Sequence, residues 1–511
     1  MPKNGLVAIV VVVVTLAGAT SKAYAQTPCA NLKSLRVAGM TITAAESING
    51  GPLLPAGLPS AAMQQPKTLL PAYCRLAAVL TPSPDSHIEM ELWMPTSGWN
   101  EKFLAVGNGG WAGAINLTGM IAALQEAYAT ASTDTGHSGG DGAFAVGHPE
   151  KVLDFAYRAV HEMTEKSKAI MTAFYGRGPQ LSYWRGCSTG GSQGLVAAQR
   201  YPEDFDGIIA GAPANQQAHL SGWRLSMETT LRKNPPMAIP PAKLTLWNQA
   251  VLAACDGLDG VTDGLLADPR RCHFDPSVLL CKGAPSNDCL TAPQVEAAKM
   301  AYAPARKKTG DLVYPGLVPG GESGWSMFSA GTTEPGVIDV GMYRYVVHQD
   351  TTWDWRTFDL NRDIELADER GGFIGNVPPD LRAFKARGGK LLIYHGWNDG
   401  GAGGAISPQS SIDFYASVLA RMGPGQGDWL RLFMVPGMAH CGGGPGPNQF
   451  AALEALRSWR EAGIPPDDIT AYHVTGNRVD MTRPLCPFPQ VAVYKGTGST
   501  NDAASFVCRV P

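Results

Sequence analysis

Five residues from Gly186 to Gly190, Gly-Cys-Ser-Thr-Gly, could carry covalent chemistry. They follow a strand-like apolar run, Leu181–Arg185, and precede a helix-like run. In a nucleophile elbow of this kind, small flanking residues allow a sharp turn that holds the serine hydroxyl above a sheet, where it faces a base. The pattern therefore predicts that Ser188 is a nucleophile.

A second serine, Ser192, also lies between paired glycines, in Gly190-Gly191-Ser192-Gln193-Gly194. It lies about one helical turn further along, where its side chain would point into helix packing. The strand that precedes Ser188 favours Ser188 over Ser192.

Two later loops supply an acid and a base in the order that α/β-hydrolases use: serine, acid, histidine. Strand-like residues 391–394 lead to Asp399, and strand-like residues 430–435 lead to His440. A neutral His440 would take the proton of Ser188, and the Asp399 carboxylate would fix its tautomer and stabilise the imidazolium. Each also has an alternative reading as an ordinary loop residue. His395 is expected to be a turn residue or to support the others.

A tetrahedral intermediate also needs N–H donors. The amide of Thr189, which follows the nucleophile, is the usual first donor. The second should come from the glycine loop 107–110, with Gly110 or Gly109 as the candidate, although an ordinary tight turn explains those glycines equally well.

The elements that must position these residues alternate between strand and helix, which predicts an α/β fold with a mostly parallel sheet. The predicted strands are 87–93, 102–106, 181–185, 207–211, 390–394, 430–435 and 469–474, and the predicted helices are 150–174, 190–200, 410–422 and 448–462.

The alternation stops after Ala214, and a structureless loop of roughly 150 residues is not expected in a compact domain. We therefore predict an inserted lid domain. The predicted organisation is a signal peptide at 1–25, the first part of the core at 26–214, a lid at 215–368 and the second part of the core at 369–511.

Residues 1–25 combine Lys3, an apolar run and the small-x-small sequence Ala23-Tyr24-Ala25, which is typical of a cleaved secretory signal. A membrane anchor would need about 20 apolar residues, and this run is shorter. A secreted or periplasmic protein with no membrane association after cleavage is expected. Net charge is −3, with 17% charged residues and no basic block, which argues against nucleic acid as a partner.

The ten cysteines form an even number in a chain that is expected to be exported, which favours disulfides. Spacing alone does not fix their connectivity. Cys255 with Cys272, and Cys281 with Cys289, are close enough to suggest local loops.

At this point the residues resemble a known family. Cys187-Ser188, Asp399 and His440-Cys441 are similar to the CS–D–HC arrangement of the tannase and feruloyl esterase family, as are the segments 107–113, 133–137 and 358–363. The resemblance covers nearly the whole mature chain. It implies an α/β-hydrolase fold with a lid, and a disulfide that ties the nucleophile loop to the base loop. The implied pairs are Cys187–Cys441, Cys29–Cys74, Cys255–Cys272, Cys281–Cys289 and Cys486–Cys508.

The resemblance also implies a structural calcium ion in the lid. The candidate ligands are the carboxylates of Asp256, Asp259 and Asp263 and the carbonyls of Val261 and Leu265, all hard oxygen donors on one glycine-turned loop. A series of solvated Asp-Gly turns is the alternative. The chain departs from the family pattern after Asp399, where extra glycine in 400–405 precedes Ile406-Ser407-Pro408 and leaves the conformation of the acid loop open.

The activity implied by the resemblance is a serine esterase that cleaves small aromatic acid esters of the feruloyl or hydroxycinnamoyl type, with no organic cofactor. Galloyl esters, as in a tannase, and terephthalate monoesters are the alternatives within the family. A noncatalytic binding protein and a peptidase with the same triad are alternatives outside it. The lid tryptophans could stack on an aromatic acyl group, although tryptophans of this kind are more often core. They are Trp223, Trp247, Trp325, Trp353 and Trp355.

Overall fold

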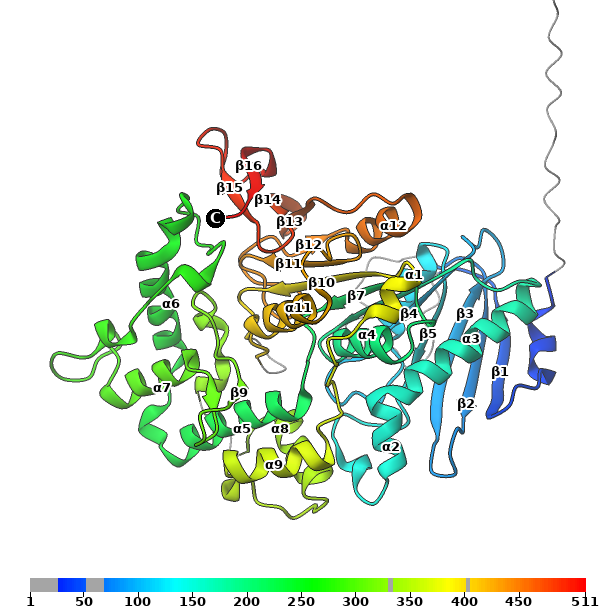
Figure 1. Cartoon of the computed structure of the whole chain (residues 1–511), viewed down its shortest axis with the longest axis horizontal. Coiled ribbons are helices and arrows are strands. Elements are labelled where there is room, and N and C mark those ends of the chain that lie inside the picture. Colours follow the sequence, from blue (N-terminus) through cyan, green and yellow to red (C-terminus); the bar gives the residue numbers. More distant parts are fainter. Residues whose placement is uncertain (1–25, 52–68, 330–333, 401–404) are drawn as a thin grey trace, which may run out of the picture.

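The computed structural model describes residues 26–51, 69–329, 334–400 and 405–511 (Figure 1). The predicted signal peptide and residues 401–404 of the acid loop lie outside the described residues. No helix of the described part has the length and apolar character needed to cross a bilayer.

A nine-stranded sheet organises the core, in the order β1-β2-β3-β5-β4-β6-β7-β10-β11. The pairs from β1 to β5 are antiparallel, and those from β5 to β11 are parallel. The predicted α/β class with a mostly parallel sheet is confirmed. The strands are β1 (Met40–Ile48), β2 (Tyr73–Leu80), β3 (Ile88–Pro95), β4 (Lys102–Val106), β5 (Ala129–Thr133), β6 (Leu181–Cys187), β7 (Gly207–Gly211), β10 (Lys390–Gly396) and β11 (Leu430–Val435).

Alternate residues of each buried strand point to opposite sides of this sheet. Both faces are therefore apolar, and helices cover both of them. Leu391 and Ile393 belong to one apolar cluster, and Leu392 between them belongs to another. The first cluster includes residues of α3 (Ala159–Tyr175), α4 (Thr189–Arg200) and α11 (Gln409–Met422), and the second includes residues of α1 (Leu117–Gln125) and α12 (Ala452–Ala462). The sheet is therefore the middle layer of three.

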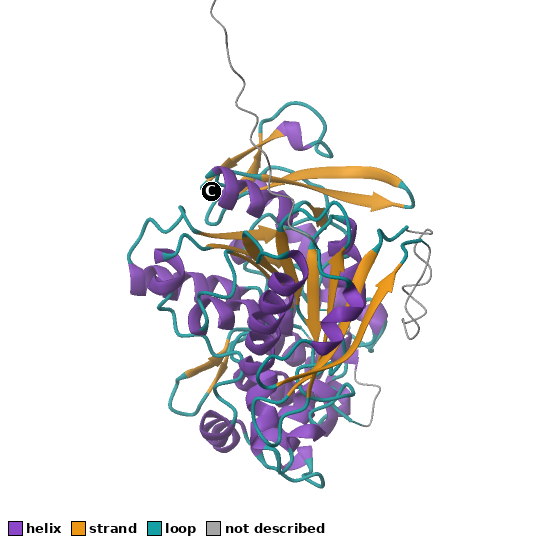
Figure 2. Cartoon of the chain, turned by 90° about the vertical axis from the view of Figure 1, so that its right-hand side faces the viewer, coloured by secondary structure: helices purple, strands orange, loops and turns teal. Residues whose placement is uncertain are grey.

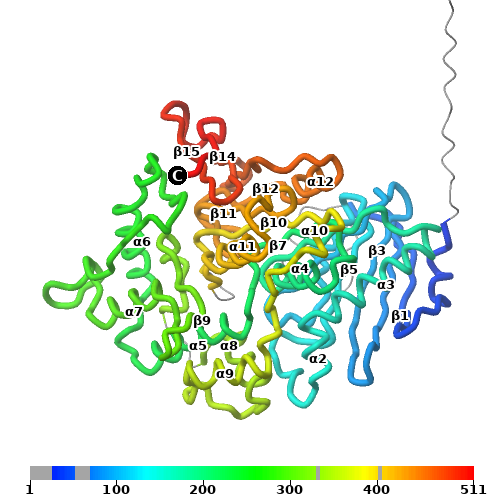
Figure 3. Tube along the Cα trace, viewed as in Figure 1, coloured from blue at the N-terminus to red at the C-terminus, as the bar shows by residue number. Residues whose placement is uncertain are grey.

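A mainly helical segment lies between β7 and β10 and has an apolar cluster of its own. Figure 3 shows its green helices at one end of the molecule, with the blue N-terminal strands at the other. All five lid tryptophans are buried within this cluster and belong to its core. The boundaries at 215 and 368 stay predictions. The elements are α5 (Gln217–Lys233), α6 (Pro241–Cys255), α7 (Ala292–Tyr302), β8 (Ala305–Arg306), β9 (Leu312–Tyr314), α8 (Val337–Gly341) and α9 (Leu360–Arg370).

Several predicted elements differ from the structure. The strand predicted at 469–474 exists as β13 (Ile469–Thr475), but it pairs with β12 (Gln449–Phe450) and β14 (Arg478–Leu485) in a separate antiparallel sheet (Figure 2). The helix predicted from 448 begins at Ala452, because β12 occupies its expected first turn. The helix predicted at 150–174 is α2 (Pro149–Leu153), a π-helical turn over 154–158, and α3. The remaining elements are α10 (Arg382–Ala386), β15 (Val491–Tyr494) and β16 (Phe506–Arg509).

The described chain contains five disulfides and no free cysteine. They are the pairs implied by the resemblance: Cys29–Cys74, Cys187–Cys441, Cys255–Cys272, Cys281–Cys289 and Cys486–Cys508.

Candidate active site

Ser188 occupies a sharp turn between β6 and α4, and its φ of 63° is in the left-handed region. Strain at a single residue of this kind is common at functional sites. A hydrogen bond from Ser188 N to Gly211 O (2.9 Å) ties the turn to the end of the neighbouring strand β7. A Cβ at Gly186 would lie 2.2 Å from Gly190 O, so only glycine allows the strand and the helix to approach this closely. The motif therefore has the geometry of a nucleophile elbow.

Asp399 and His440 meet after the strands β10 and β11. His440 Nδ1 lies 2.7 Å from Asp399 Oδ2, and Asp399 is only 1% exposed. Burial alone would raise the pKa of Asp399, but the charge of His440 and hydrogen bonds from His395 and His440 outweigh it and hold the pKa at about 2. The carboxylate is therefore ionised when it meets the imidazole.

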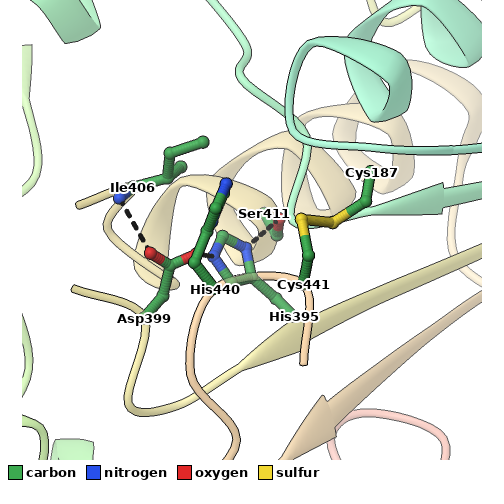
Figure 4. The surroundings of a disulfide bond; sticks show 7 residues. All are labelled: Cys187, His395, Asp399, Ile406, Ser411, His440 and Cys441. Carbon is green, nitrogen blue, oxygen red and sulfur yellow. Dashed lines mark hydrogen bonds and ion pairs between the residues drawn. A yellow bond between two sulfur atoms is a disulfide. The ribbon is translucent and has the colours of Figure 1, made fainter. Parts of the chain in front are cut away.

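The disulfide between Cys187 and Cys441 brings the serine and the histidine together, since each is the direct neighbour of one bridged cysteine (Figure 4). The two Cα atoms of the bridge are 5.9 Å apart, although the cysteines are 254 residues apart in sequence. Within the described residues the Ser188 hydroxyl makes no hydrogen bond to His440. Catalytic contacts of this type often tighten only when substrate binds.

A third polar side chain at the same carboxylate is His395, which the sequence predicts to be a turn residue or a supporting residue. His395 Nε2 lies 3.1 Å from Asp399 Oδ2, and its Nδ1 lies 2.8 Å from Ser411 Oγ. The second oxygen, Asp399 Oδ1, accepts a hydrogen bond from Ile406 N (3.1 Å). The position of His395 at the end of a strand was visible in the sequence, but its contact with Asp399 was not.

The glycine loop after β4 packs against the first turn of α4. Gly190 N donates to Asn108 O (2.8 Å), and Thr189 Oγ1 donates to Gly110 O (3.1 Å). Asn108 Nδ2 in turn donates to Thr133 O (2.8 Å), which ties the loop to the end of β5. Thr189 and Gly110, the two predicted oxyanion donors, are thus neighbours beside the elbow.

The lid contacts both loops that serve the triad. Trp111 Nε1 donates to Ile338 O (2.9 Å) from the glycine loop to α8. On the acid loop, Asn398 Nδ2 donates to Gly320 O (2.8 Å) and Ser407 Oγ donates to Gly316 O (2.6 Å). These contacts hold the glycine loop 107–110 and the acid loop against the same inserted segment.

The acidic lid loop carries the predicted calcium ligands. Asp256 accepts from Gly264 N (2.9 Å), Asp259 accepts from Val261 N (3.0 Å), and Asp263 Oδ2 pairs with Arg483 of β14 (2.6 Å). Burial, and then the charges of Asp263 and Asp256, raise the pKa of Asp259.

A bound cation would relieve the repulsion between Asp256, Asp259 and Asp263. The oxygen donors of this loop, including the backbone carbonyl of Leu265, are of the kind that calcium prefers. In the described part of the chain, however, no three acidic, histidine or cysteine side chains are gathered closely enough to hold a metal.

Comparison with known proteins places this site in a family. The family model described as "Tannase and feruloyl esterase" matches residues 74–509. An uncharacterised esterase of Xanthomonas campestris pv. campestris is 36% identical, over 99% of this chain and 95% of its own. The probable feruloyl esterase B-1 of Aspergillus oryzae is 34% identical, over 87% of this chain and 85% of its own.

Solved structures agree with this assignment. The crystal structure of feruloyl esterase B from Aspergillus oryzae has a TM-score of 0.88 and 31% identity, covering 94% of this chain and 99% of that one. Tannin acyl hydrolase from Aspergillus niger, with a TM-score of 0.73 and 24% identity over 93% and 92% of the two chains, shares the fold. The α/β-hydrolase fold is confirmed, and the chain belongs to the tannase and feruloyl esterase family.

Proposed function

We propose that this chain, a carboxylic ester hydrolase by its family, cleaves small aromatic acid esters of the feruloyl or hydroxycinnamoyl type through an acyl-enzyme on Ser188. The observation that carries the proposal is the 2.7 Å contact between His440 and an ionised Asp399, tied by a disulfide to the elbow that holds Ser188.

In the first half of the reaction, Ser188 Oγ attacks the ester carbonyl carbon while His440 Nε2 takes the hydroxyl proton. Asp399 accepts the Nδ1–H of the resulting imidazolium. The oxyanion accepts hydrogen bonds from the amides of Thr189 and Gly110. The intermediate then collapses, the C–O bond to the alcohol breaks, and His440 gives its proton to the departing alkoxide.

In the second half, water attacks the acyl carbon and His440 takes a proton from it. Collapse of this intermediate breaks the bond to Ser188 Oγ, to which His440 returns the proton, and the aromatic acid leaves. A neutral His440 and an ionised Asp399 are regenerated, so the cycle needs no further reactant.

The feruloyl class is favoured over the galloyl class by the greater similarity to feruloyl esterase B than to tannin acyl hydrolase, both in identity and in TM-score. A terephthalate monoester would call for a cation beside its free carboxylate. Two cationic side chains of the lid have other contacts: Lys307 lies 3.9 Å from Glu365, and Arg344 donates to Trp353 O (3.1 Å).

The first test is acid release from methyl ferulate, methyl gallate and a terephthalate monoester by the wild type and by Ser188→Ala. Ser192→Ala is the matched control, because Ser192 is the other serine between paired glycines and is 4% exposed. We expect ferulate to be the best substrate, Ser188→Ala to lose at least about 10³-fold in kcat and Ser192→Ala to keep it. Activity on none of the three esters, or an active Ser188→Ala, would refute the proposal. Cleavage of peptide amides would indicate a peptidase instead.

We further propose an exported protein and a structural calcium ion on the loop 256–265. Five disulfides favour an oxidising compartment. Three carboxylates on one loop favour a hard cation. Since Asp256, Asp259 and Asp263 are not gathered closely enough to hold a metal in the described structure, the ion would have to draw them together, with the carbonyls of Val261 and Leu265 as further ligands. Chelator should then lower the thermal midpoint of the wild type and leave that of an Asp259→Asn variant unchanged. An equal response of the two proteins to chelator would count against the ion.

A further inference from the structure

His395 is a buried histidine that the reaction described above does not use. It is the penultimate residue of the strand β10, is 0% exposed, and makes two side-chain hydrogen bonds, to Asp399 and to Ser411 of α11. Figure 4 shows it beside the carboxylate that also serves His440. A buried polar group of this kind is costly unless all its partners are well placed.

The tautomer of His395 follows from its partners. Ser411 is 0% exposed, and its hydroxyl has one hydrogen-bond partner among the described residues, His395 Nδ1. A buried hydroxyl donates where an acceptor is available, so Nδ1 carries the lone pair and Nε2 carries the hydrogen. His395 is then a neutral imidazole that donates its Nε2–H to Asp399 Oδ2.

Asp399 Oδ2 consequently accepts two imidazole N–H groups, from His395 at 3.1 Å and from His440 at 2.7 Å. Oδ1 accepts the amide of Ile406. Three donors from three different segments fix the plane of the carboxylate. The donor from His395 also withdraws negative charge from the very oxygen that faces the base.

We propose that His395, held in its Nε2–H tautomer by Ser411, is a positioning residue that orients Asp399 and sets the proton affinity of His440. Without its N–H, Oδ2 is more negative and less firmly held. His440 then binds its proton more tightly, and the acidic limb of the pH–rate profile moves to higher pH. The plateau kcat falls because the carboxylate no longer fixes the imidazole in one orientation. This inference rests on the proposed serine esterase function.

Other ionisable groups near the site do not produce such a shift. Tyr314 of β9 is fully buried and its pKa is raised by that burial. Arg224 of α5 is held in an ion pair with Asp339 (2.6 Å) and stays charged. Asp413 of α11 accepts a hydrogen bond from Gln409 on its own helix (2.8 Å) and is present in every variant to be compared.

The test compares His395→Leu, His395→Gln and Ser411→Ala with the wild type. The glutamine amide nitrogen can occupy the place of Nε2 and keep the donor. For His395→Leu we expect kcat to fall about 10- to 100-fold, which is typical when a residue that hydrogen-bonds and orients a functional side chain is removed. KM should stay within about threefold of the wild-type value. The acidic limb should move up by about half a pH unit or more. His395→Gln should recover most of both effects, and Ser411→Ala should lose part of each.

His161→Gln is the matched control, because His161 also pairs with an aspartate (Asp204, 3.0 Å) but lies on α3, away from the triad. It should leave both kcat and the limb unchanged. If His395→Leu does not fold, the position of the acidic limb of the pH–rate profile is compared between Ser411→Ala, His395→Gln and the wild type.

An acidic limb that stays in place or moves down in a folded variant lacking the donor would overturn the inference, as would His395→Gln behaving like His395→Leu. Failure of the proposed function would look different, since the wild type would then be inactive or insensitive to Ser188→Ala.

Discussion

At the scale of single residues, the elbow depends on a contact that only glycine permits. Gly186→Ala would place a methyl group 2.2 Å from Gly190 O, a backbone atom that cannot move without displacing the start of α4. We expect a fall in kcat/KM of about 100-fold or more, since small misplacements of a nucleophile are costly. Gly427→Ala is the control, because a Cβ there meets nothing within 4 Å. Equal activity of the two variants would show that the elbow tolerates the change.

Asp134 gives the molecule a pH-dependent stability. It follows β5 and is 7% exposed, and Oδ1 accepts hydrogen bonds from Glu89 N (2.9 Å) and Gly136 N (2.8 Å). Burial outweighs these bonds and raises its pKa to about 7. Between about pH 4 and pH 7 the unfolded chain therefore releases a proton that the folded chain retains. The stabilising contribution is fully present below pH 4 and is lost as pH rises towards 7.

The expected size of this loss is on the order of 4 kcal/mol. In Asp134→Asn the amide oxygen keeps both hydrogen bonds, and the side chain no longer titrates. The free energy of unfolding should therefore fall less between pH 5 and pH 8 in this variant than in the wild type. Urea denaturation of both proteins at the two pH values measures the difference. Parallel pH dependences would contradict the assignment to Asp134.

At the scale of elements, the disulfide Cys187–Cys441 joins the end of β6 to the loop after β11 across 254 residues. We expect the double variant Cys187→Ser, Cys441→Ser to lose up to about 5 kcal/mol of stability through loop entropy. It should also lose kcat more than KM, because Ser188 and His440 are no longer held together. The matched control is Cys486→Ser, Cys508→Ser, which opens a bridge beside the C-terminal sheets and should lower the thermal midpoint while leaving kcat intact. A double variant at 187 and 441 with full kcat would show that packing alone aligns the loops.

Elements with strong local patterns could be predicted, and those set by distant contacts could not. Residues 102–106 and 207–211 are apolar runs between turn residues, and both are strands of the sheet. β5, Ala-Thr-Ala-Ser-Thr, is buried throughout but contains no large apolar residue, so the sequence gives only a weak hydrophobic signal for it. The two-residue strand β12 exists only because it pairs with β13.

The candidate site divides in the same way. Motif and chain order predict Ser188, Asp399 and His440 as the candidate triad, since the ends of parallel strands lie at one edge of the sheet, and in the structure Asp399 and His440 are in contact. The support of these residues by His395 and by the lid could not be predicted, because those contacts depend on side-chain directions that the spacing of residues in the sequence does not encode.

At the scale of the whole molecule, the lid packs against the loops of the core that carry the candidate site. A substitution of Ser407 tests whether this contact matters for activity. Its hydroxyl donates to Gly316 O of the lid at 2.6 Å, and Ser407 is 0% exposed. Ser407→Ala leaves a buried carbonyl without its partner, which costs about 1–3 kcal/mol of stability. Because Ser407 ends the segment that carries Asp399 and Ile406, the loss should also reach the triad.

We therefore expect Ser407→Ala to lower kcat by about tenfold with little change in KM, in addition to lowering the thermal midpoint. Thr164→Val is the control, since it removes an equally buried hydroxyl, bonded to Val160 O at 2.7 Å, from α3, which belongs to the core and lies away from the lid (Figure 1). It should lower the midpoint by a similar amount and leave kcat within about twofold. If the two variants lose activity only in proportion to stability, the lid stabilises the fold without aligning the acid. If Ser407→Ala alone loses kcat at temperatures where both are folded, the lid and the triad act as one unit.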